Sequence, residues 1–223
     1  CTGGGCLAPV RWFVAKLKEA DGSLDATFSA DGKAWVTFDN DSFPTAIDID
    51  SSGRPVIAGY SDTGGVEYRI SVARLLVDGT LDDSFSGDGE LQIVGALGDD
   101  DLAQAIKIQS DDKIIIGVDH QSGGLYDFML VRINTDGVLD NTFSGDGIVQ
   151  TDLGGDGDII RSITIQSDGK ILACGQNNTA TKDFAIARYN TDGSLDTGFS
   201  DDGFTMIDFG GLTDICLSVS VQT

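Results

Sequence analysis

One twelve-residue phrase occurs four times in this chain and restricts the fold more than any other feature. The copies follow the pattern DGxLDxxFSxDG and begin at Asp21, Asp78, Asp136 and Asp192, so their starts lie 57, 58 and 56 residues apart. A self-similar period of this size is typical of stacked or radially arranged supersecondary units. The repeat therefore argues against a single irregular core.

Each repeat unit contains four short candidate strands in a fixed order around the phrase. An alternating run such as 162–166 (SITIQ) leads through an SDG-type turn to an apolar run such as KILACG from Lys170. A third run, such as FAIARY from Phe184, precedes the phrase, and a fourth follows it. Alternation of this kind is typical of half-buried strands. The sequence therefore predicts an all-β chain, a β-propeller-like array of four-stranded antiparallel blades.

The repeat units do not divide the chain evenly. Framed to begin with the alternating strand, three complete blades occupy about 44–94, 102–152 and 159–208. Residues 9–38 would supply the third and fourth strands of a further blade, and 213–223 a first strand, which makes one split and incomplete blade. Two interpretations stay open: further blades beyond Thr223, or a gap that accepts a strand from another copy. We expect a flexible tether over 1–8 and one repeat domain over 9–223.

The internal repeats resemble the bacterial delta-60 repeat family of propeller-like surface and secreted proteins. The resemblance depends on the segments FAIARYNTDGSLDTGFSDDG and SITIQSDGKILACG, and it covers nearly everything after residue 10. It implies a propeller fold and an extracellular or cell-surface setting, with the bacterial envelope as the expected place. It implies little about activity, because propellers host many functions.

The charge of the chain restricts its partners. With 14 basic and 36 acidic residues, the net charge is −22. Such a charge repels phosphate backbones and anionic lipid headgroups, so we expect neither nucleic acid nor a membrane surface as a partner. No hydrophobic run approaches the roughly 20 residues of a membrane span.

Each phrase carries three aspartates at matching offsets, and two interpretations of them stay open. Carboxylates in a Gly-rich loop suit calcium, although the pattern is not an EF-hand. Alternatively, they form and cap tight turns, and the basic residue before each phrase (Lys16, Arg74, Arg132 or Arg188) pairs with one of them. We favour the structural role, with calcium as the alternative cofactor. The aspartates are Asp21, Asp25, Asp31, Asp78, Asp82, Asp88, Asp136, Asp140, Asp146, Asp192, Asp196 and Asp202.

The four cysteines are too few for a dense disulfide framework in a chain of this length. The start CTGGGC resembles a mature lipoprotein with a lipid on Cys1; a Cys1 to Cys6 disulfide or a truncated chain are the alternatives. Cys174 and Cys216 lie in apolar runs, where buried thiols are one interpretation and a bridge between neighbouring strands is the other.

No catalytic signature accompanies the repeat. His120 is the only histidine, and acids recur in every unit, whereas an active site is normally built once. Further acidic clusters at 39–41, 99–101 and 156–158 precede the first strands and should gather at one face. We expect a non-catalytic extracellular structural or adhesive module and no enzyme, with other copies of itself or a larger surface protein as partners.

Two other classes of function remain as alternatives. The first is a propeller that binds a glycan or peptide on its loop face, for which Tyr60, Tyr68, His120 and Tyr126 are the candidates because they are not repeated. The second is a hydrolase that uses a pair of carboxylates, since paired aspartates are common in this chain.

Overall fold

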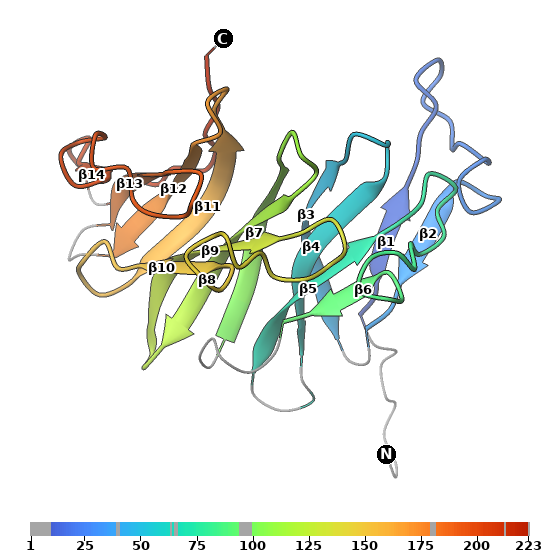
Figure 1. Ribbon diagram of the computed structural model, residues 1–223, viewed down its shortest axis with the longest axis horizontal. Helices are drawn as coiled ribbons and strands as arrows, with labels where there is room; N and C mark the ends of the chain where they lie inside the picture. The colour runs from blue at the N-terminus through green and yellow to red at the C-terminus, as the bar shows by residue number, and fades with distance from the viewer. Residues whose placement is uncertain are drawn as a thin grey trace.

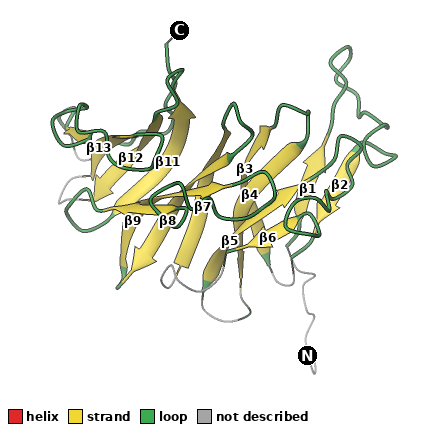
Figure 2. Cartoon of the chain, in the orientation of Figure 1, coloured by secondary structure: helices red, strands yellow, loops and turns green. Residues whose placement is uncertain are grey.

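The computed structural model describes residues 10–38, 41–62, 64, 67–93, 100–178, 182–211 and 213–222. These residues form fourteen strands and no helix (Figure 2). Within this part of the chain, no helix is long and apolar enough to cross a membrane. The tether expected over 1–8, including Cys1 and Cys6, lies outside the described residues.

The strands form one two-stranded and three four-stranded antiparallel sheets that follow one another along the long axis of the molecule (Figure 1). This arrangement confirms the all-β, propeller-like fold class. The two-stranded sheet, called here the half-blade, consists of β1 (Trp12–Ala15) and β2 (Lys33–Val36). Blade 1 consists of β3 (Ser42–Ile49), β4 (Pro55–Asp62), β5 (Tyr68–Arg74) and β6 (Glu90–Gln92). Blade 2 consists of β7 (Asp100–Ile108), β8 (Ile114–Ser122), β9 (Leu125–Ile133) and β10 (Ile148–Thr151). Blade 3 consists of β11 (Asp158–Ile165), β12 (Ile171–Asn178), β13 (Lys182–Tyr189) and β14 (Phe204–Ile207).

The core lies between blades, because the second and third strands carry apolar residues on both faces. The cluster between blades 1 and 2 includes Val72, Ile106 and Ile116, and the cluster between blades 2 and 3 includes Leu130 and Ile163. Each first strand has a bulge, which leaves one residue without a partner across the ladder: Thr45, Gln104 and Arg161. A bulge re-aims the side chain of the extra residue.

The repeated phrase connects the third and fourth strands of each unit and also joins neighbouring units. Its serine has a positive φ and donates its backbone N–H to the first aspartate carbonyl of the next copy. This bond measures 2.6 Å from Ser29 to Asp78, and equivalent bonds start at Ser86 and Ser144. The Arg132 guanidinium crosses the same boundary to the carbonyl of Thr191 at 2.6 Å and lies over the Phe143 ring.

The two parts of the incomplete unit lie at opposite ends of the array (Figure 1). The half-blade packs beside β3, whereas residues 213–222 lie against blade 3. A disulfide joins Cys174 in β12 to Cys216. Of the two interpretations of these cysteines, a bridge and buried thiols, the structure thus has the bridge. The backbone N–H of Cys216 also donates to the Gly175 carbonyl at 3.0 Å. The bridge therefore fixes the C-terminal segment on the last blade.

Candidate functional site at the start of the inner strands

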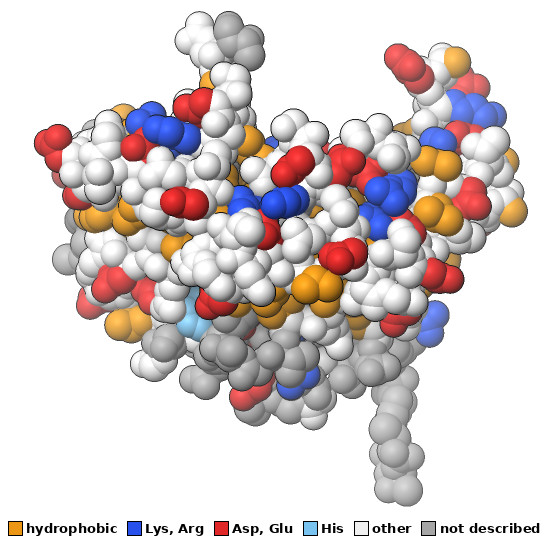
Figure 3. All heavy atoms as spheres, viewed as in Figure 1, with side chains coloured by type: hydrophobic (Ala, Val, Ile, Leu, Met, Phe, Trp, Pro, Cys, Tyr) orange, Lys and Arg blue, Asp and Glu red, His pale blue; other side chains and the backbone are white. Residues whose placement is uncertain are grey.

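All twelve phrase aspartates serve in turns. Each accepts a hydrogen bond from the backbone N–H two residues later, as Asp140 does from Thr142 at 3.0 Å. Small groups of Lys and Arg side chains lie among acidic side chains on the visible face (Figure 3). The structure thus gives each phrase aspartate a structural role.

The middle aspartate of the phrase also receives two cations in every complete blade. Asp140 contacts Arg132 at 2.7 Å and Lys113 at 2.9 Å through one carboxylate oxygen. Burial alone would raise the pKa of Asp140, but the bonds from Lys113 and Thr142 and the charge of Arg132 hold it well below its usual range. The predicted pairing of the basic residue with a phrase aspartate is confirmed in all four units, for Lys16, Arg74, Arg132 and Arg188.

The phrase aspartates do not gather in threes around a common point in the described chain. The groups close enough to share an ion are Asp127, Asp152 and Asp158, and their equivalents Asp183, Asp208 and Asp214 one repeat later. Calcium binding by the phrase therefore stays a prediction. An acidic cluster alone is common on an acidic protein surface.

The opposite edge of the blades is chemically different. We call it the strand-start edge, because the first and third strands of each blade begin there and the second strand ends there. In blade 2, buried Asp101 contacts Nδ1 of His120 at 2.7 Å. In blade 3, buried Asp158 accepts a bond from the Asn177 amide at 2.7 Å at the equivalent position. Burial raises the pKa of both carboxyls to about 6.

Asp119, at the end of β8, is the most perturbed of these carboxyls. It is 4% exposed; its Oδ1 accepts the Ile160 backbone N–H at 2.7 Å and its Oδ2 accepts the Gln104 amide at 2.9 Å. The nearest guanidinium, Arg161, is 3.9 Å away. Burial raises the pKa of Asp119 to about 7, because these partners only partly offset the loss of water. Its carboxyl is therefore held between the bulge residues of two neighbouring inner strands.

A second carboxylate lies on the same face of blade 2. The register pairs Asp100 with Gln121 and Leu102 with Asp119, so Asp100 and Asp119 point to one side of the sheet. Tyr126 pairs with Gln121 and shares this side. Burial raises the pKa of Tyr126, and the charges of Asp100 and Asp119 raise it further, which places both carboxyls near the phenol. Asp119 reaches β11 through the Ile160 N–H, whereas the Asp100 carboxylate accepts the Tyr68 N–H of blade 1.

Aromatic rings continue the strand-start edge into blade 1. The rings of Phe43, Tyr60 and Tyr68 form a cluster in which Tyr60 lies 5.3 Å from each of the other two. The backbone N–H of Tyr68 donates to Asp100 at 2.9 Å, which connects the cluster to blade 2. The structure thus brings the predicted binding candidates Tyr60, Tyr68, His120 and Tyr126 to a single edge.

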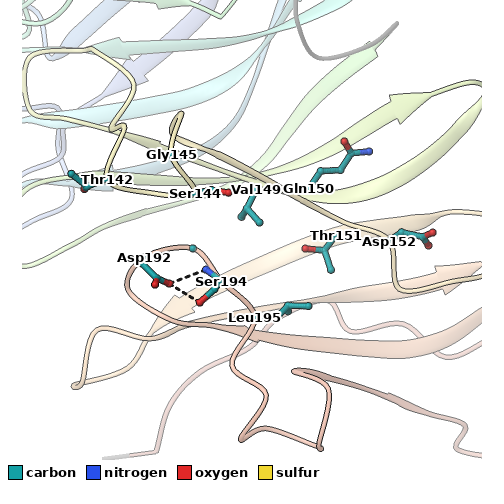
Figure 4. A pocket seen from close by; sticks show the side chains of 11 residues that line it. Thr142, Ser144, Gly145, Val149, Gln150, Thr151, Asp152, Asp192, Ser194 and Leu195 are labelled. Atoms are coloured by element: carbon teal, nitrogen blue, oxygen red, sulfur yellow. Dashed lines mark hydrogen bonds between the residues drawn. The ribbon is translucent and has the colours of Figure 1, made fainter.

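A separate groove of about 640 Å³ lies between blades 2 and 3, beside the phrases (Figure 4). Several of its polar side chains make internal bonds: Ser194 donates to Asp192, and Thr151 accepts the Tyr189 hydroxyl. Hydrogen bonds from Ser194 lower the pKa of Asp192. The groove thus offers an ionised, turn-bound carboxylate, so we place the candidate chemistry at the strand-start edge.

Our sequence reasoning did not single out Asp119, although a signal existed. The aligned second strands place Tyr60, Asp119 and Gln176 at one position, so this acid interrupts the repeat. An acid that occurs in one unit only fits a site that is built once. The phrase acids occur four times and are structural.

A comparison with known protein families supports the fold. The family model "Domain of unknown function (DUF5122) beta-propeller" matches residues 51–85, 109–143 and 166–199. The chain is thus built from β-propeller repeats. No curated protein matches the sequence. A solved structure, "Crystal Structure of Exo-1,5-alpha-L-arabinanase from Bovine Ruminal Metagenomic Library", is similar with a TM-score of 0.40 and 16% identity. The match covers 76% of this chain and 57% of that one.

This comparison corrects one expectation. The prediction of a non-catalytic structural or adhesive module, and of no enzyme, was wrong as an inference from the fold, because the similar structure is that of an enzyme. The expectation relied on the repetition of the phrase acids and overlooked acids that occur once. At this level of similarity the match assigns no activity to this chain.

Proposed function

We propose that the strand-start edge of blade 2 hydrolyses glycosidic bonds, with Asp119 as the general acid. The observation that carries the proposal is the buried carboxyl whose pKa is raised to about 7. A general acid needs a proton near neutral pH and a pKa close to the working pH. Most aspartates do not meet this condition.

Glycoside hydrolysis needs a second carboxylate as well. Asp100 supplies it, because it shares the face of Asp119 and lies near the same phenol. In the proposed reaction Asp119 donates its proton to the leaving-group oxygen as the glycosidic C–O bond breaks. Asp100 takes a proton from the water whose oxygen bonds to the sugar carbon. Gln104 and Arg161 flank Asp119 and are the groups that position the substrate.

We expect a neutral glycan as the substrate. A net charge of −22 disfavours polyanionic chains. The Tyr60–Tyr68 pair offers apolar ring faces and polar hydroxyls, which suits sugar rings, and the Tyr68 backbone N–H contacts Asp100.

The test is a screen of neutral polysaccharides and aryl glycosides for released reducing ends. The expected result is turnover by the wild type that declines above about pH 7, as the pKa of Asp119 dictates, and a loss of about 100-fold or more in Asp119→Asn. Asp136→Asn, in an exposed phrase turn, is the matched control and should retain activity. Turnover that is equal in both variants would overturn the assignment of Asp119.

A further inference from the structure

We propose that the unpaired edge of β1 is a docking site for an extended peptide segment that begins with Lys or Arg and continues with aliphatic residues. The occupant is thus a β-strand of a partner polypeptide whose first residue is basic. The inference is independent of the proposed hydrolase, because it concerns the other end of the molecule.

The half-blade exposes a groove that is filled in every complete blade. Among the described residues, β1 pairs with β2 alone. A cavity of about 420 Å³ lies along its other edge, bounded by Phe13, Val14 and Ala15 on one side and by Pro44 and Ile47 on the other. A second cavity, of about 160 Å³, continues past Lys16 and Phe28. The walls are mainly apolar, which favours a strand with aliphatic side chains.

The exposure of equivalent residues shows what the groove lacks. Ile47 in β3 is 53% exposed, whereas its equivalents Ile106 and Ile163 are 4% and 2% exposed. Those two lie against the second strand of the preceding blade, through the β4–β7 and β8–β11 contacts. Ile47 occupies the same position on a first strand, beside a half-blade without that strand. A strand paired to β1 would therefore bury it.

The charge at the end of the groove specifies the first residue of the occupant. In each complete blade the middle phrase aspartate contacts a third-strand arginine and a second cation from the start of the second strand. These second contacts are Arg54 to Asp82 at 2.9 Å, Lys113 to Asp140 at 2.9 Å and Lys170 to Asp196 at 2.8 Å. In the half-blade, Asp25 contacts Lys16 at 3.2 Å, and no second cation reaches it among the described residues. Asp25 is thus complementary to an incoming Lys or Arg.

The repeat also sets the register of the occupant. Ile115 pairs with Arg132 and lies two residues after Lys113. Since Lys16 is the equivalent of Arg132, a docked strand should place its third residue opposite Lys16 and its first residue beside Asp25. The chain's own segment 110–119, SDDKIIIGVD, contains this pattern from Lys113 onward and is a suitable probe.

The experiment measures fluorescence anisotropy of this labelled ten-residue peptide with the intact protein. Saturable binding is expected, and Asp25→Asn should weaken it about tenfold through loss of the charge-assisted contact. A peptide with the lysine replaced by glutamate should lose as much on the wild type and nothing further on Asp25→Asn. The control variant is Asp21→Asn, in the same phrase, whose bonds stay within its own turn. Equal melting temperatures of the two variants by circular dichroism would show that each is folded.

Three results would overturn the proposal. The first is an absence of saturable binding by folded wild-type protein. The second is binding that neither Asp25→Asn nor the glutamate peptide weakens. The third is a dimer in light scattering without peptide in which the Phe13 and Ala15 amides are protected from exchange, since a second copy would then occupy the edge.

Discussion

Two aspartates of the same blade show how one residue type serves opposite purposes at the two edges of the molecule. Asp140, at the phrase edge, faces Arg132 and Lys113 within 3 Å and is held ionised. Asp119, at the strand-start edge, is equally buried, but its nearest guanidinium is 3.9 Å away, and burial raises its pKa to about 7. Both side chains are nearly inaccessible to solvent, but burial acts more strongly on Asp119 and two close cations contact only Asp140; these two differences together separate the pKa values. Burial raises the pKa of each carboxyl, and the hydrogen bonds and charges of its partners decide whether the final pKa lies above or below the ordinary value.

The largest expected loss of stability comes from removing a cation that contacts the ionised Asp140. Arg132→Ala removes the partner of Asp140, the bond to the Thr191 carbonyl and the contact with Phe143. Because a buried charge is left with less compensation, the free energy of unfolding should fall by about 3–5 kcal/mol. Urea denaturation at pH 7 measures it. Arg188→Ala is the matched control and should cost clearly less, since Arg188 is more exposed. Equal losses of stability in the two variants would contradict the view that Arg132 stabilises the contact between neighbouring repeat units.

Removing the two charges should have unequal consequences. Asp140→Asn deletes an ionised acceptor with several bonds and should cost about 2 kcal/mol at pH 7. Asp119→Asn replaces a carboxyl that is about half protonated at that pH and should cost less than about 1 kcal/mol. The comparison uses the same urea experiment. A larger cost for Asp119→Asn would reverse the proposed protonation states.

The pH dependence of stability should carry the signature of the strand-start edge. The pKa values of Asp101, Asp119 and Asp158 are raised, so the folded state binds these protons more tightly than the unfolded state. Their contribution is present below the ordinary pKa of 3.8 and is lost as pH rises through about 6 to 7. The urea midpoint should therefore fall between pH 5 and pH 8 at constant ionic strength. Asp119→Asn should reduce this slope, whereas an unchanged slope would count against a raised pKa.

The smallest effect concerns the tuning of Asp119. The amide of Gln104 donates to this carboxyl and thereby lowers its pKa, opposing burial. Gln104→Leu should therefore raise the pKa of Asp119 further, by less than about one unit. Carboxyl titration by NMR measures the shift. Gln109→Leu, which lies just beyond the opposite end of β7, should leave it in place.

The repeated features of the fold could be predicted from the sequence, and the non-repeated ones only in part. Alternation and the DG turns defined four strands per unit, and the basic residue before each phrase was correctly paired with an aspartate. The candidate site depends on the bulges, which bring Gln104 and Arg161 to Asp119 from two blades. No local pattern encodes that meeting, because it depends on how neighbouring sheets pack.

The pKa of Asp119 is the most direct test of the comparison between the edges. Carboxyl carbon shifts of ¹³C-labelled protein, followed from pH 3 to pH 9, would assign each aspartate by comparison with Asp119→Asn. We predict a carboxyl that titrates near pH 7 in the wild type and is missing in the variant, while Asp140 stays ionised over most of this range. Titration of Asp119 near pH 4, together with the exposed acids, would contradict the account.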